Sequence, residues 1–410
     1  MRMLASFAVS LLILSSTFAQ DWPQWRGPNR DGTLSVSAAF PTDLKNLTKA
    51  WSVSDLGPSY SGPIVADGMV FTTATVANKT EVVTAYRLED GTRVWTRDWA
   101  GAMSVPFFAA KNGSWIRSTP AYFQGKLYVG GMRDYLVCLD AKTGVVDWKA
   151  DFTADAKSPL PAFGFVCSPL VDESGVYVQA GSSFAKLDRK TGKVLWQTLK
   201  DDGGTLGSAF SSPIRVKSAG RDQFIVQTRT KLAGVAADDG SVLWVKEIPS
   251  FRGMNILTPQ PYGTDELFTS TYGGKSQLIR LGVSGSTIAP ESKWAINYEG
   301  HMTSPVVVGD VAYLLGKDQK FIAFDLKAGK EAWRSEKRFG IYWSLIACGD
   351  KILALDQRGI LFLVKADPNE FEIIDEKKIA DSESWAHLAV AGKLIVVRDL
   401  NSLTAYKFAK

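Results

Sequence analysis

The sequence predicts an all-β fold, an eight-bladed β-propeller of four-stranded antiparallel blades. Two observations predict it: a unit of roughly 45 residues recurs along the chain, and each copy holds four short β-rich runs separated by turn residues. Strands joined by tight turns form one antiparallel sheet, and sheets that repeat with this period pack radially around an axis. The clearest copies, each running from a Ser/Thr-x-Pro start or a near variant to a Trp strand, are residues 118–148, 167–196, 211–244 and 303–333.

Each strand of a copy has its own signal. In the copy that begins at Ser118, the β-rich run Gly125–Val129 follows the start, and the apolar run Leu136–Asp140 follows next. The turn Lys142-Thr143-Gly144 then leads into a strand that carries Trp148. The same order of signals in the other copies predicts the same four strands in each blade.

The blade count depends on how the two ends of the chain are interpreted. The seventh copy has Phe371-Glu372-Ile373-Ile374 in place of a Trp strand, and the eighth copy lacks this strand altogether. The segment 48–53 looks like a last strand without its first three, so we expect it to pair with the C-terminal blade and close the ring. Seven blades remain the alternative. Predicted blade starts lie near Ser61, Ser118, Cys167, Ser211, Leu257, Thr303, Trp343 and Trp385.

The recurring tryptophan is predicted to be structural. A buried indole removes about 150–250 Å² of surface from water, which at about 25 cal/mol per Å² is about 4–6 kcal/mol as an upper bound. Rings stacked between blades would hold one sheet against the next. The residues at this position are Trp51, Trp95, Trp148, Trp196, Trp244, Trp294 and Trp333.

The N-terminus predicts export. Residues 1–19 combine Arg2, the apolar run Leu11–Leu14 and the small-x-small site Thr17-Phe18-Ala19, which together are typical of a cleaved signal peptide. The apolar run is too short for a membrane span, and no Cys follows it, so no lipid anchor is expected. We expect a cap or linker over residues 20–47, one propeller domain over residues 48–410, and a periplasmic or extracellular location.

Charge and cysteine content exclude several classes of function. The net charge of +5 is mild and no long basic run occurs, so nucleic acid is not an expected partner. The three cysteines, Cys138, Cys167 and Cys348, leave at least one free thiol. Buried free thiols are one interpretation, and a Cys138–Cys167 disulfide between neighbouring blades is the other. No metal-type Cys/His spacing occurs, and no metal site is predicted.

Two segments carry a family resemblance. Leu139–Trp148 and Leu187–Trp196 resemble the pyrroloquinoline quinone (PQQ) repeat, and the pattern covers about residues 48–408. The resemblance implies a radial architecture comparable to WD40 propellers. Proteins with this repeat include PQQ-dependent alcohol and sugar dehydrogenases and non-catalytic BamB-like propellers of outer-membrane assembly. The opening Asp21–Gly32 is also similar to exported PQQ-like propellers of planctomycete-type bacteria. This chain lacks the adjacent Cys pair of the dehydrogenases, and their Ca²⁺-binding Glu/Asn/Asp set has no match.

Residues just before the innermost strands are predicted to converge at the mouth of the central channel. Most of these segments contain an aromatic residue or a histidine, which suits stacking on a planar ligand or a sugar ring. The alternative is that the rings plug the channel. For the two histidines, proton transfer and a backbone-satisfied structural role are both open. The residues are Tyr60, Trp115, Arg117, Phe163, Phe165, Phe210, Arg252, Asn255, His301, Tyr342, Trp343, Trp385 and His387.

Basic residues recur in the loops between the second and third strands of six blades. Cations above an aromatic floor would favour a flat anionic ligand, such as PQQ, an acidic glycan or a peptide carboxylate. The alternative is solvated loop charges, some of them paired with the adjacent Asp. These cations are Arg133, Arg229, Lys275, Lys317, Arg358 and Arg398.

No complete catalytic motif occurs in the sequence. We therefore expect an exported, non-catalytic propeller that acts as a binding scaffold for a protein, peptide or carbohydrate and holds no tightly bound cofactor. The alternative is a compact PQQ- and Ca²⁺-dependent alcohol or sugar dehydrogenase, in which the quinone would stack over the channel mouth.

Overall fold

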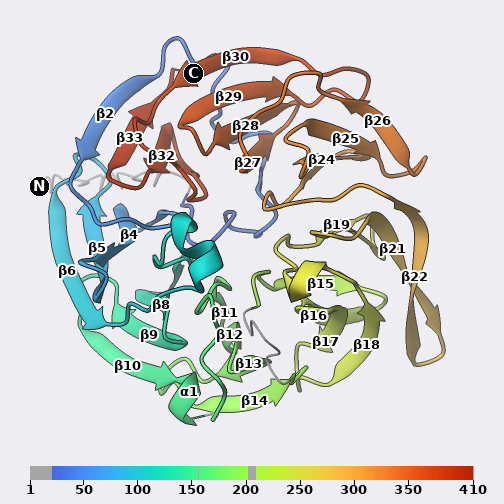
Figure 1. The fold of residues 1–410 in the computed structure, drawn as a ribbon, viewed down its shortest axis with the longest axis horizontal. Helices are drawn as coiled ribbons and strands as arrows, with labels where there is room; N and C mark the ends of the chain where they lie inside the picture. Colours follow the sequence, from blue (N-terminus) through green and yellow to red (C-terminus); the bar gives the residue numbers. More distant parts are fainter. Residues whose placement is uncertain (1–20, 156, 202–208, 410) are drawn as a thin grey trace, which may run out of the picture.

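The computed structural model describes residues 21–155, 157–201 and 209–409 and confirms the eight-bladed propeller. Eight antiparallel sheets surround a central axis, with the first strand of each blade at the hub and the last at the rim (Figure 1). The seven-blade alternative is wrong, because the degenerate seventh copy forms a complete sheet. The predicted signal, residues 1–19, lies outside the described residues.

Each blade contains four antiparallel strands, which are given below in order from the hub outward. Blades 1 to 4 are β3 (Ile64–Ala66), β4 (Met69–Val76), β5 (Thr80–Arg87) and β6 (Arg93–Ala100); β7 (Ala121–Phe123), β8 (Lys126–Gly131), β9 (Tyr135–Asp140) and β10 (Val146–Asp151); β11 (Leu170–Asp172), β12 (Gly175–Ala180), β13 (Ser183–Leu187) and β14 (Val194–Thr198); β15 (Ile214–Ser218), β16 (Arg221–Gln227), β17 (Lys231–Ala236) and β18 (Val242–Glu247). Blades 5 to 8 are β19 (Gln260–Tyr262), β20 (Glu266–Ser270), β21 (Ser276–Ser284) and β22 (Thr287–Ile296); β23 (Val306–Val308), β24 (Val311–Leu315), β25 (Phe321–Asp325) and β26 (Lys330–Arg334); β27 (Trp343–Cys348), β28 (Lys351–Asp356), β29 (Ile360–Lys365) and β30 (Ile373–Lys378); β31 (Ala389–Ala391), β32 (Leu394–Arg398), β33 (Leu403–Lys407) and β2 (Thr48–Val53).

The ring closes where the sequence predicts. Strand β2 pairs antiparallel with β33, with Thr48 opposite Lys407 and Val53 opposite Leu403. The N-terminal strand therefore supplies the rim of the blade whose other three strands lie at the C-terminus. This pairing covers the edge that an incomplete blade would expose.

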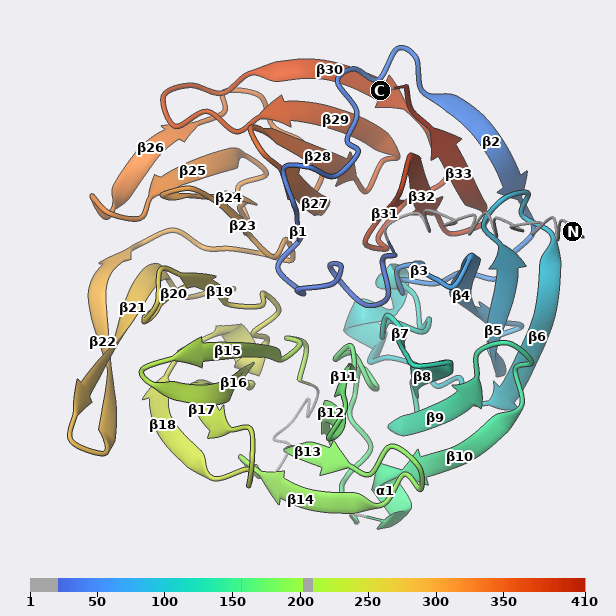
Figure 2. The same cartoon turned by 180° about the vertical axis from the view of Figure 1, so that it is seen from behind.

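The segment that precedes β2 crosses the hub on the face seen in Figure 2. It is attached to three blades: Trp22 forms a β-bridge with Val65, the Tyr122 amide donates to the Pro23 carbonyl, and β1 (Thr33–Leu34) pairs in parallel with β27. The segment expected to be a cap or linker thus covers one end of the channel and adds a fifth strand to blade 7.

The hydrophobic core lies between neighbouring sheets. Between blades 1 and 2, for example, Phe71, Val83 and Trp95 pack with Leu127 and Leu139 in one buried cluster. Middle strands therefore have apolar residues on both faces, as in Met69–Val76, instead of a strict alternation with polar residues.

The repeat tryptophans join each blade to the next. Five of these indoles donate from Nε1 to a backbone carbonyl of the following blade at 2.8–2.9 Å, while Trp244 bonds to Gln223 of its own blade. Turn glycines of the following blade pack closely over several of the rings, as Gly144 does over Trp95. The five donor–acceptor pairs are Trp51–Leu88, Trp95–Ala141, Trp148–Arg189, Trp294–Leu326 and Trp333–Asp367.

A second set of contacts joins the blades near the hub. In blades 2 to 6, the hydroxyl residue directly before the proline of the start motif accepts a hydrogen bond from a backbone amide of the preceding blade. Five successive links run around the ring in this way at 2.9–3.2 Å, which gives the recurring Ser/Thr of the motif a structural role. The links are Gly62 to Thr119, Thr119 to Ser168, Ser168 to Ser212, Ser212 to Thr258, and Thr258 to Ser304.

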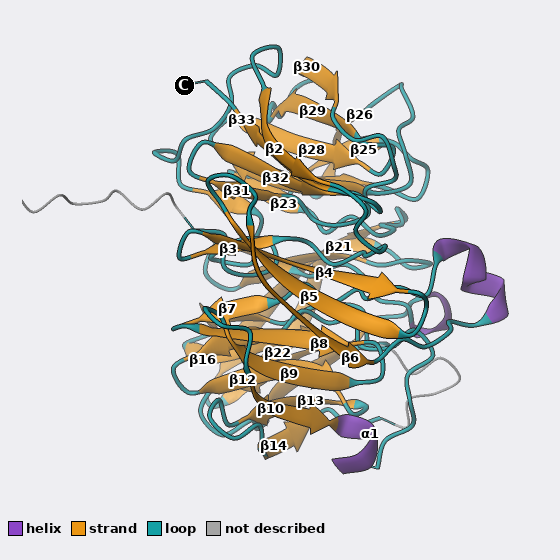
Figure 3. Cartoon of the chain, turned by 90° about the vertical axis from the view of Figure 1, so that its left-hand side faces the viewer, coloured by secondary structure: helices purple, strands orange, loops and turns teal. Residues whose placement is uncertain are grey.

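The short helices all lie on the face opposite the N-terminal segment, shown at the right of Figure 3. They are the 3-10 helices η1 (Phe107–Asn112) and η2 (Phe251–Gly253) and the α-helix α1 (Phe152–Asp155). Nowhere in the described part of the chain does a helix have the length and apolar character needed to cross a membrane. All three cysteines are buried free thiols, so the disulfide interpretation of Cys138 and Cys167 is wrong.

Candidate functional site: the mouth of the central channel

Two arginines from the N-terminal segment close one end of the channel. Arg30 donates to the carbonyls of Ser168, Pro169 and Pro213 at 2.7–2.9 Å, and Arg26 donates to the carbonyl of Pro305. These carbonyls belong to the inner edges of blades 3, 4 and 6, where the sheets have no further strand to pair with. The guanidinium groups therefore satisfy exposed sheet edges, as a cap over the hub requires.

Both guanidinium groups are buried without a carboxylate partner among the described residues. Burial lowers the pKa of Arg26 and of Arg30 to about 10, because desolvation disfavours the charged form. They lie 5.5 and 5.7 Å from the centre of the Trp25 ring. The closed end is thus positively charged, with an indole between these cations and the channel.

Above Trp25 lies a cavity of about 110 Å³. It is large enough for several water molecules or for one small group of a ligand, while a larger ligand would extend out of the mouth. The lining residues are Trp25, Tyr60, Arg117, Thr119, Val166, Ser168, Phe210, Ser212, Ile256, Met302, Ser304, Tyr342, Trp343, Leu345, Trp385 and His387.

Half-buried aromatic rings form the rim of this cavity. Trp385 is stacked with Tyr342 at 5.9 Å between ring centres and lies 5.5 Å from the ring of Tyr60. The Trp385 indole donates to the Glu383 carboxylate at 2.7 Å, which holds the ring in place. Burial raises the pKa of Tyr60 to about 12, so its phenol stays neutral at physiological pH.

Arg117 is the cation of the mouth. Its Nη2 donates to the carbonyl of Gly113 at 2.8 Å, and its Cζ lies 5.0 Å from the centre of the Tyr60 ring. Its Nε is buried and has no hydrogen-bond partner among the described residues. Desolvation lowers the pKa of Arg117 to about 10, which still leaves the side chain charged at neutral pH. A partly buried, incompletely bonded guanidinium at a cavity is an anion-binding group.

The wall below the rim carries hydroxyl groups. Thr119, Ser168 and Ser304 all line the cavity, and each hydroxyl oxygen accepts a backbone N–H from the preceding blade. A hydroxyl that accepts in this way keeps its own hydrogen to donate. The wall therefore offers O–H donors below a cationic and aromatic rim.

The cavity lacks acidic groups. None of the described residues that line it is Asp or Glu, and its histidine, His387, is buried and neutral. Burial and the nearby Arg26 lower the pKa of His387 to about 3. The described residues contain no cluster of three or more His, Cys, Asp or Glu side chains suited to a metal ion.

The structure brings together seven of the thirteen residues predicted at the mouth. Tyr60, Arg117, Phe210, Tyr342, Trp343, Trp385 and His387 line the cavity.

The other six lie outside it. Phe165 is buried between blades 2 and 3, and Asn255 is buried with its amide donating to three backbone carbonyls. Phe163 is buried against Phe210. The remaining three are placed around the rim: Trp115 against Tyr60, His301 against Tyr272, and Arg252 on the surface.

None of the six predicted loop cations lines the cavity, and most have partners elsewhere. Arg398 is buried and donates to backbone carbonyls, including that of Gly57. Three others form ion pairs, and Arg133 and Lys275 are exposed. The ion pairs are Arg229–Asp201, Lys317–Glu299 and Arg358–Asp356.

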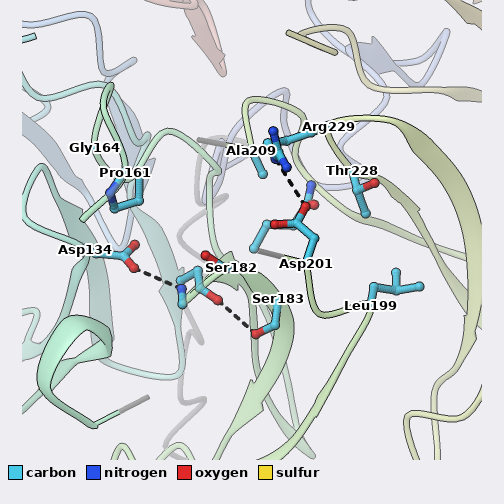
Figure 4. A pocket seen from close by; sticks show the side chains of 13 residues that line it. Asp134, Pro161, Gly164, Ser182, Ser183, Leu199, Asp201, Ala209, Thr228 and Arg229 are labelled. Atoms are coloured by element: carbon cyan, nitrogen blue, oxygen red, sulfur yellow. Dashed lines mark hydrogen bonds and ion pairs between the residues drawn. The ribbon is translucent and has the colours of Figure 1, made fainter. Parts of the chain in front are cut away.

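A smaller pocket of about 20 Å³ lies between loops of blades 2, 3 and 4 on the same face (Figure 4). Asp134 accepts a hydrogen bond from the Gly181 amide at 2.9 Å, and Asp201 is paired with Arg229 at 3.2 Å. Burial raises the pKa of Asp134 to about 6. These carboxylates are used in contacts between blades, and the space between them holds little more than one water molecule.

Sequence reasoning missed Trp25, Arg26 and Arg30. The run Trp25–Asp31 contains Gly and Pro, which signal a turn, but nothing in it says that the turn lies at the hub. Its position follows from the bridge to Val65 and the pairing of β1 with β27.

The radial sheets, the Trp contacts between blades and the capped channel define a β-propeller of the PQQ-repeat type. A family model described as outer membrane protein assembly factor BamB matches residues 79–335, more than half of the chain, and the chain belongs to this family.

The relatives include dehydrogenases and outer-membrane assembly factors. The chain is 30% identical to 1-butanol dehydrogenase (cytochrome c) of Thauera butanivorans over 44% of this chain and 26% of that protein. It is 22% identical to outer membrane protein assembly factor BamB of Shewanella oneidensis over 67% of this chain and 63% of that protein. The match thus spans about a quarter of the first relative and under two thirds of the second. A europium-containing methanol dehydrogenase has the same fold, with a TM-score of 0.70 at 13% identity over 95% of this chain and 98% of that chain.

Proposed function

We propose that this protein is an exported, non-catalytic propeller that binds a ligand at the channel mouth, and that the ligand presents a ring together with a carboxylate. The composition of the cavity carries the proposal. Its described lining has aromatic rings, hydroxyl donors and one guanidinium, and no carboxylate.

Each part of the cavity has a matching part in such a ligand. A ring stacks on Trp385 or Tyr60 at the rim. A carboxylate directed into the cavity accepts from the Arg117 guanidinium and from wall hydroxyls such as that of Ser168. Acidic sugars are the first class to test, since uronic acids combine these two features in one residue.

The similarity to 1-butanol dehydrogenase favours a second candidate, a compact PQQ- and Ca²⁺-dependent dehydrogenase. The residues of the mouth do not fit its metal. Protein-bound Ca²⁺ takes six to eight oxygen ligands that include carboxylates, whereas the oxygen-bearing side chains of the cavity are hydroxyls and phenols. A base for substrate deprotonation is also missing from the described lining, because it holds no carboxylate and burial lowers the pKa of His387 to about 3, which makes its imidazole a weak base.

Export and a scaffold role rest on further observations. The signal-like N-terminus supports export to the periplasm or beyond. Membership of a family described as an assembly factor supports a binding role, with a protein or peptide as an additional partner. The mature chain is therefore proposed to work outside the cytoplasm.

The test is calorimetric titration of the purified mature protein with trigalacturonic acid, with maltotriose as the neutral control. A parallel titration uses PQQ with and without CaCl₂, followed by dye reduction with a panel of alcohols and sugars. Arg117→Met removes the cation of the mouth but keeps most of its bulk. Arg93→Met, on the exposed rim strand β6, is the matched control.

The proposal expects binding of the acidic sugar over the neutral one, at least tenfold weaker binding by Arg117→Met, and an unchanged Arg93→Met. Calcium-dependent PQQ binding with turnover would reject the proposed binding function in favour of the PQQ-dependent dehydrogenase. Equal binding of trigalacturonic acid and maltotriose, or no binding of either, would also reject it.

A further inference from the structure

The mouth face carries an exposed aromatic protrusion. Helix η1 is inserted between blades 1 and 2, and the segment is anchored by Val105 and Ala109, which pack with Met132 in a buried cluster. Its outer side is open to solvent: Phe107 is 91% exposed, and Phe108, which contacts Phe163, is 49% exposed. One side of the insertion is thus held by the propeller, while the other presents two aromatic rings to solvent.

A second insertion meets this protrusion. Helix η2, between blades 4 and 5, carries Phe251, which is 46% exposed, and Arg252. The Arg252 guanidinium carbon lies 5.2 Å from the centre of the Phe251 ring and 5.9 Å from that of Phe108. The cation therefore lies close to rings from two insertions that are far apart in the sequence.

Arg252 has an unusual backbone conformation and no acidic partner among the described residues. Its φ of 53° and ψ of 28° fall in the left-handed region, which a non-glycine residue adopts only at a cost. It has no carboxylate in ion-pair contact in the part of the chain that the structure describes, and neither η1 nor η2 carries an acidic residue in its first turn. Its charge is therefore available to a partner.

We propose that Phe107, Phe108, Phe251 and Arg252, which we call the Phe–Arg surface, form a docking site for a peptide segment of a partner protein, with an apolar side chain next to a carboxylate. The rings would contact the apolar side chain, and Arg252 would pair with the carboxylate. Aromatic residues and arginine are the types that contribute most to binding at protein interfaces. This docking site is separate from the cavity, and it rests on the protein or peptide partner proposed above, for which it names the surface and the chemistry of the bound segment.

The arrangement favours a protein segment over a lipid surface. Insertion into lipid needs an apolar tip and a loose set of flanking cations. The Phe–Arg surface places one guanidinium within 6 Å of the centres of two rings, which favours a carboxylate at one position relative to an apolar group. Such a positional requirement is met by a peptide sequence.

The experiment selects a phage-displayed random 12-residue library on the immobilised mature protein and then measures the selected peptides by fluorescence anisotropy. The expected peptides carry Asp or Glu within a few residues of Leu, Phe or another large apolar residue. The double variant Phe107→Ser/Phe108→Ser is expected to weaken their binding at least tenfold. Arg93→Ser/Val94→Ser is the matched control, since it removes a cation and an exposed apolar residue from the rim strand β6.

Arg252→Glu gives the sharpest readout. If the charge pairing is correct, selection on this variant enriches Lys or Arg in place of Asp or Glu, a reversal that a purely structural role for Arg252 would not produce. Three results would overturn the proposal: no enrichment over a blank support, selected peptides that bind the Phe variant as tightly as the parent, or an unchanged charge preference on Arg252→Glu. Phe107-dependent sedimentation with phosphatidylglycerol vesicles in the absence of selected peptides would assign the surface to a membrane instead.

Discussion

Trp95 Nε1 donates a hydrogen bond to the carbonyl oxygen of Ala141 at 2.9 Å, and this bond links the rim of blade 1 to a turn of blade 2. In the same turn, Gly144 packs directly on the Trp95 ring. The pattern Asp-x-x-Thr-Gly, here Asp140 to Gly144, therefore serves two purposes: it forms the turn of blade 2 and it makes room for the indole of blade 1. Asp140 accepts from the Thr143 amide and hydroxyl to shape the turn, and the glycine leaves room for the neighbouring indole.

Replacing Gly144 by Ala is expected to destabilise the fold by about 2–5 kcal/mol. A Cβ at this position would lie 2.5 Å from the Trp95 ring, and its φ of 69° is left-handed. The left-handed conformation alone costs about 1–2 kcal/mol, and overpacking adds about 1–3 kcal/mol. Urea unfolding followed by circular dichroism measures the change.

The control for this prediction is Gly125→Ala. Gly125 also has a left-handed φ, of 78°, but a Cβ there would meet nothing within 4 Å. The Gly125→Ala variant should therefore lose only the stability that the left-handed backbone conformation costs, about 1–2 kcal/mol. Equal losses for Gly125→Ala and Gly144→Ala would show that contact with Trp95 does not set the requirement for glycine.

Arg30→Lys is expected to destabilise the protein by about 2–4 kcal/mol, although charge is conserved. The guanidinium reaches the carbonyls of Ser168, Pro169 and Pro213 at once. A lysine ammonium is a single point and leaves buried acceptors unsatisfied, at about 1–3 kcal/mol for each lost partner. Thermal and urea unfolding against the exposed Arg93→Lys would test this. A loss below about 1 kcal/mol would mean that the N-terminal segment contributes little to the stability of the ring.

Much of the fold was predictable because propeller repeats are local. The strand order, the eight blades and the closure by Thr48–Val53 all follow from signals within one copy and from counting copies. The aromatic rim was predictable in part for the same reason, since Tyr60, Phe210 and Trp385 directly precede inner strands. The repeat sets where such a residue lies in the chain but not which way its side chain points, since Phe165 and Asn255 also precede inner strands and lie outside the cavity.

The remaining features of the site depend on contacts between distant segments. Arg358 resembles a free loop cation in the sequence, but in the structure it forms an ion pair with Asp356 of the same loop. Arg26 and Arg30 belong to a segment outside the repeat, so periodicity says nothing about where they lie. The pairing of Phe108 with Arg252 joins two insertions, and insertions are the parts of a repeat protein that its repeat does not describe.

Asp134→Asn is expected to stabilise the protein near pH 7.5 by up to about 3 kcal/mol. The pKa of Asp134 is raised from 3.8 to about 6 by burial, and the nearby Asp151 adds to this. The folded state therefore binds a proton more tightly than the unfolded state between these values. The stability that the Asp134 carboxyl contributes is fully present below pH 3.8 and is lost as the pH rises through 6. An asparagine does not ionise, so the variant does not lose this stability.

The measurement is the urea unfolding free energy of parent and Asp134→Asn at pH 4.0, 5.0, 6.0 and 7.5. The difference between them should grow with pH and level off above about pH 6. Asparagine keeps an acceptor for the Gly181 amide, so this hydrogen bond is preserved. A difference that does not change with pH would place the Asp134 pKa near its ordinary value.

His387 should make the protein sensitive to acid in the opposite direction. Its ring is buried, stacked with Trp22 at 6.5 Å, and donates from Nδ1 to the Leu388 carbonyl. Burial, with Arg26 adding to it, lowers its pKa from 6.5 to about 3. Below pH 6.5 the unfolded chain binds a proton at His387 that the folded protein does not bind, so the free energy of unfolding falls by about 1.4 kcal/mol for each pH unit until about pH 3.

A His387→Gln variant should be less stable than the parent at pH 7.5, because the packing is poorer, but should lose less stability between pH 6.5 and 4.5. Parallel unfolding curves over this range, with equal losses in both proteins, would mean that His387 is protonated in the folded state and that the closed end of the channel is open to water.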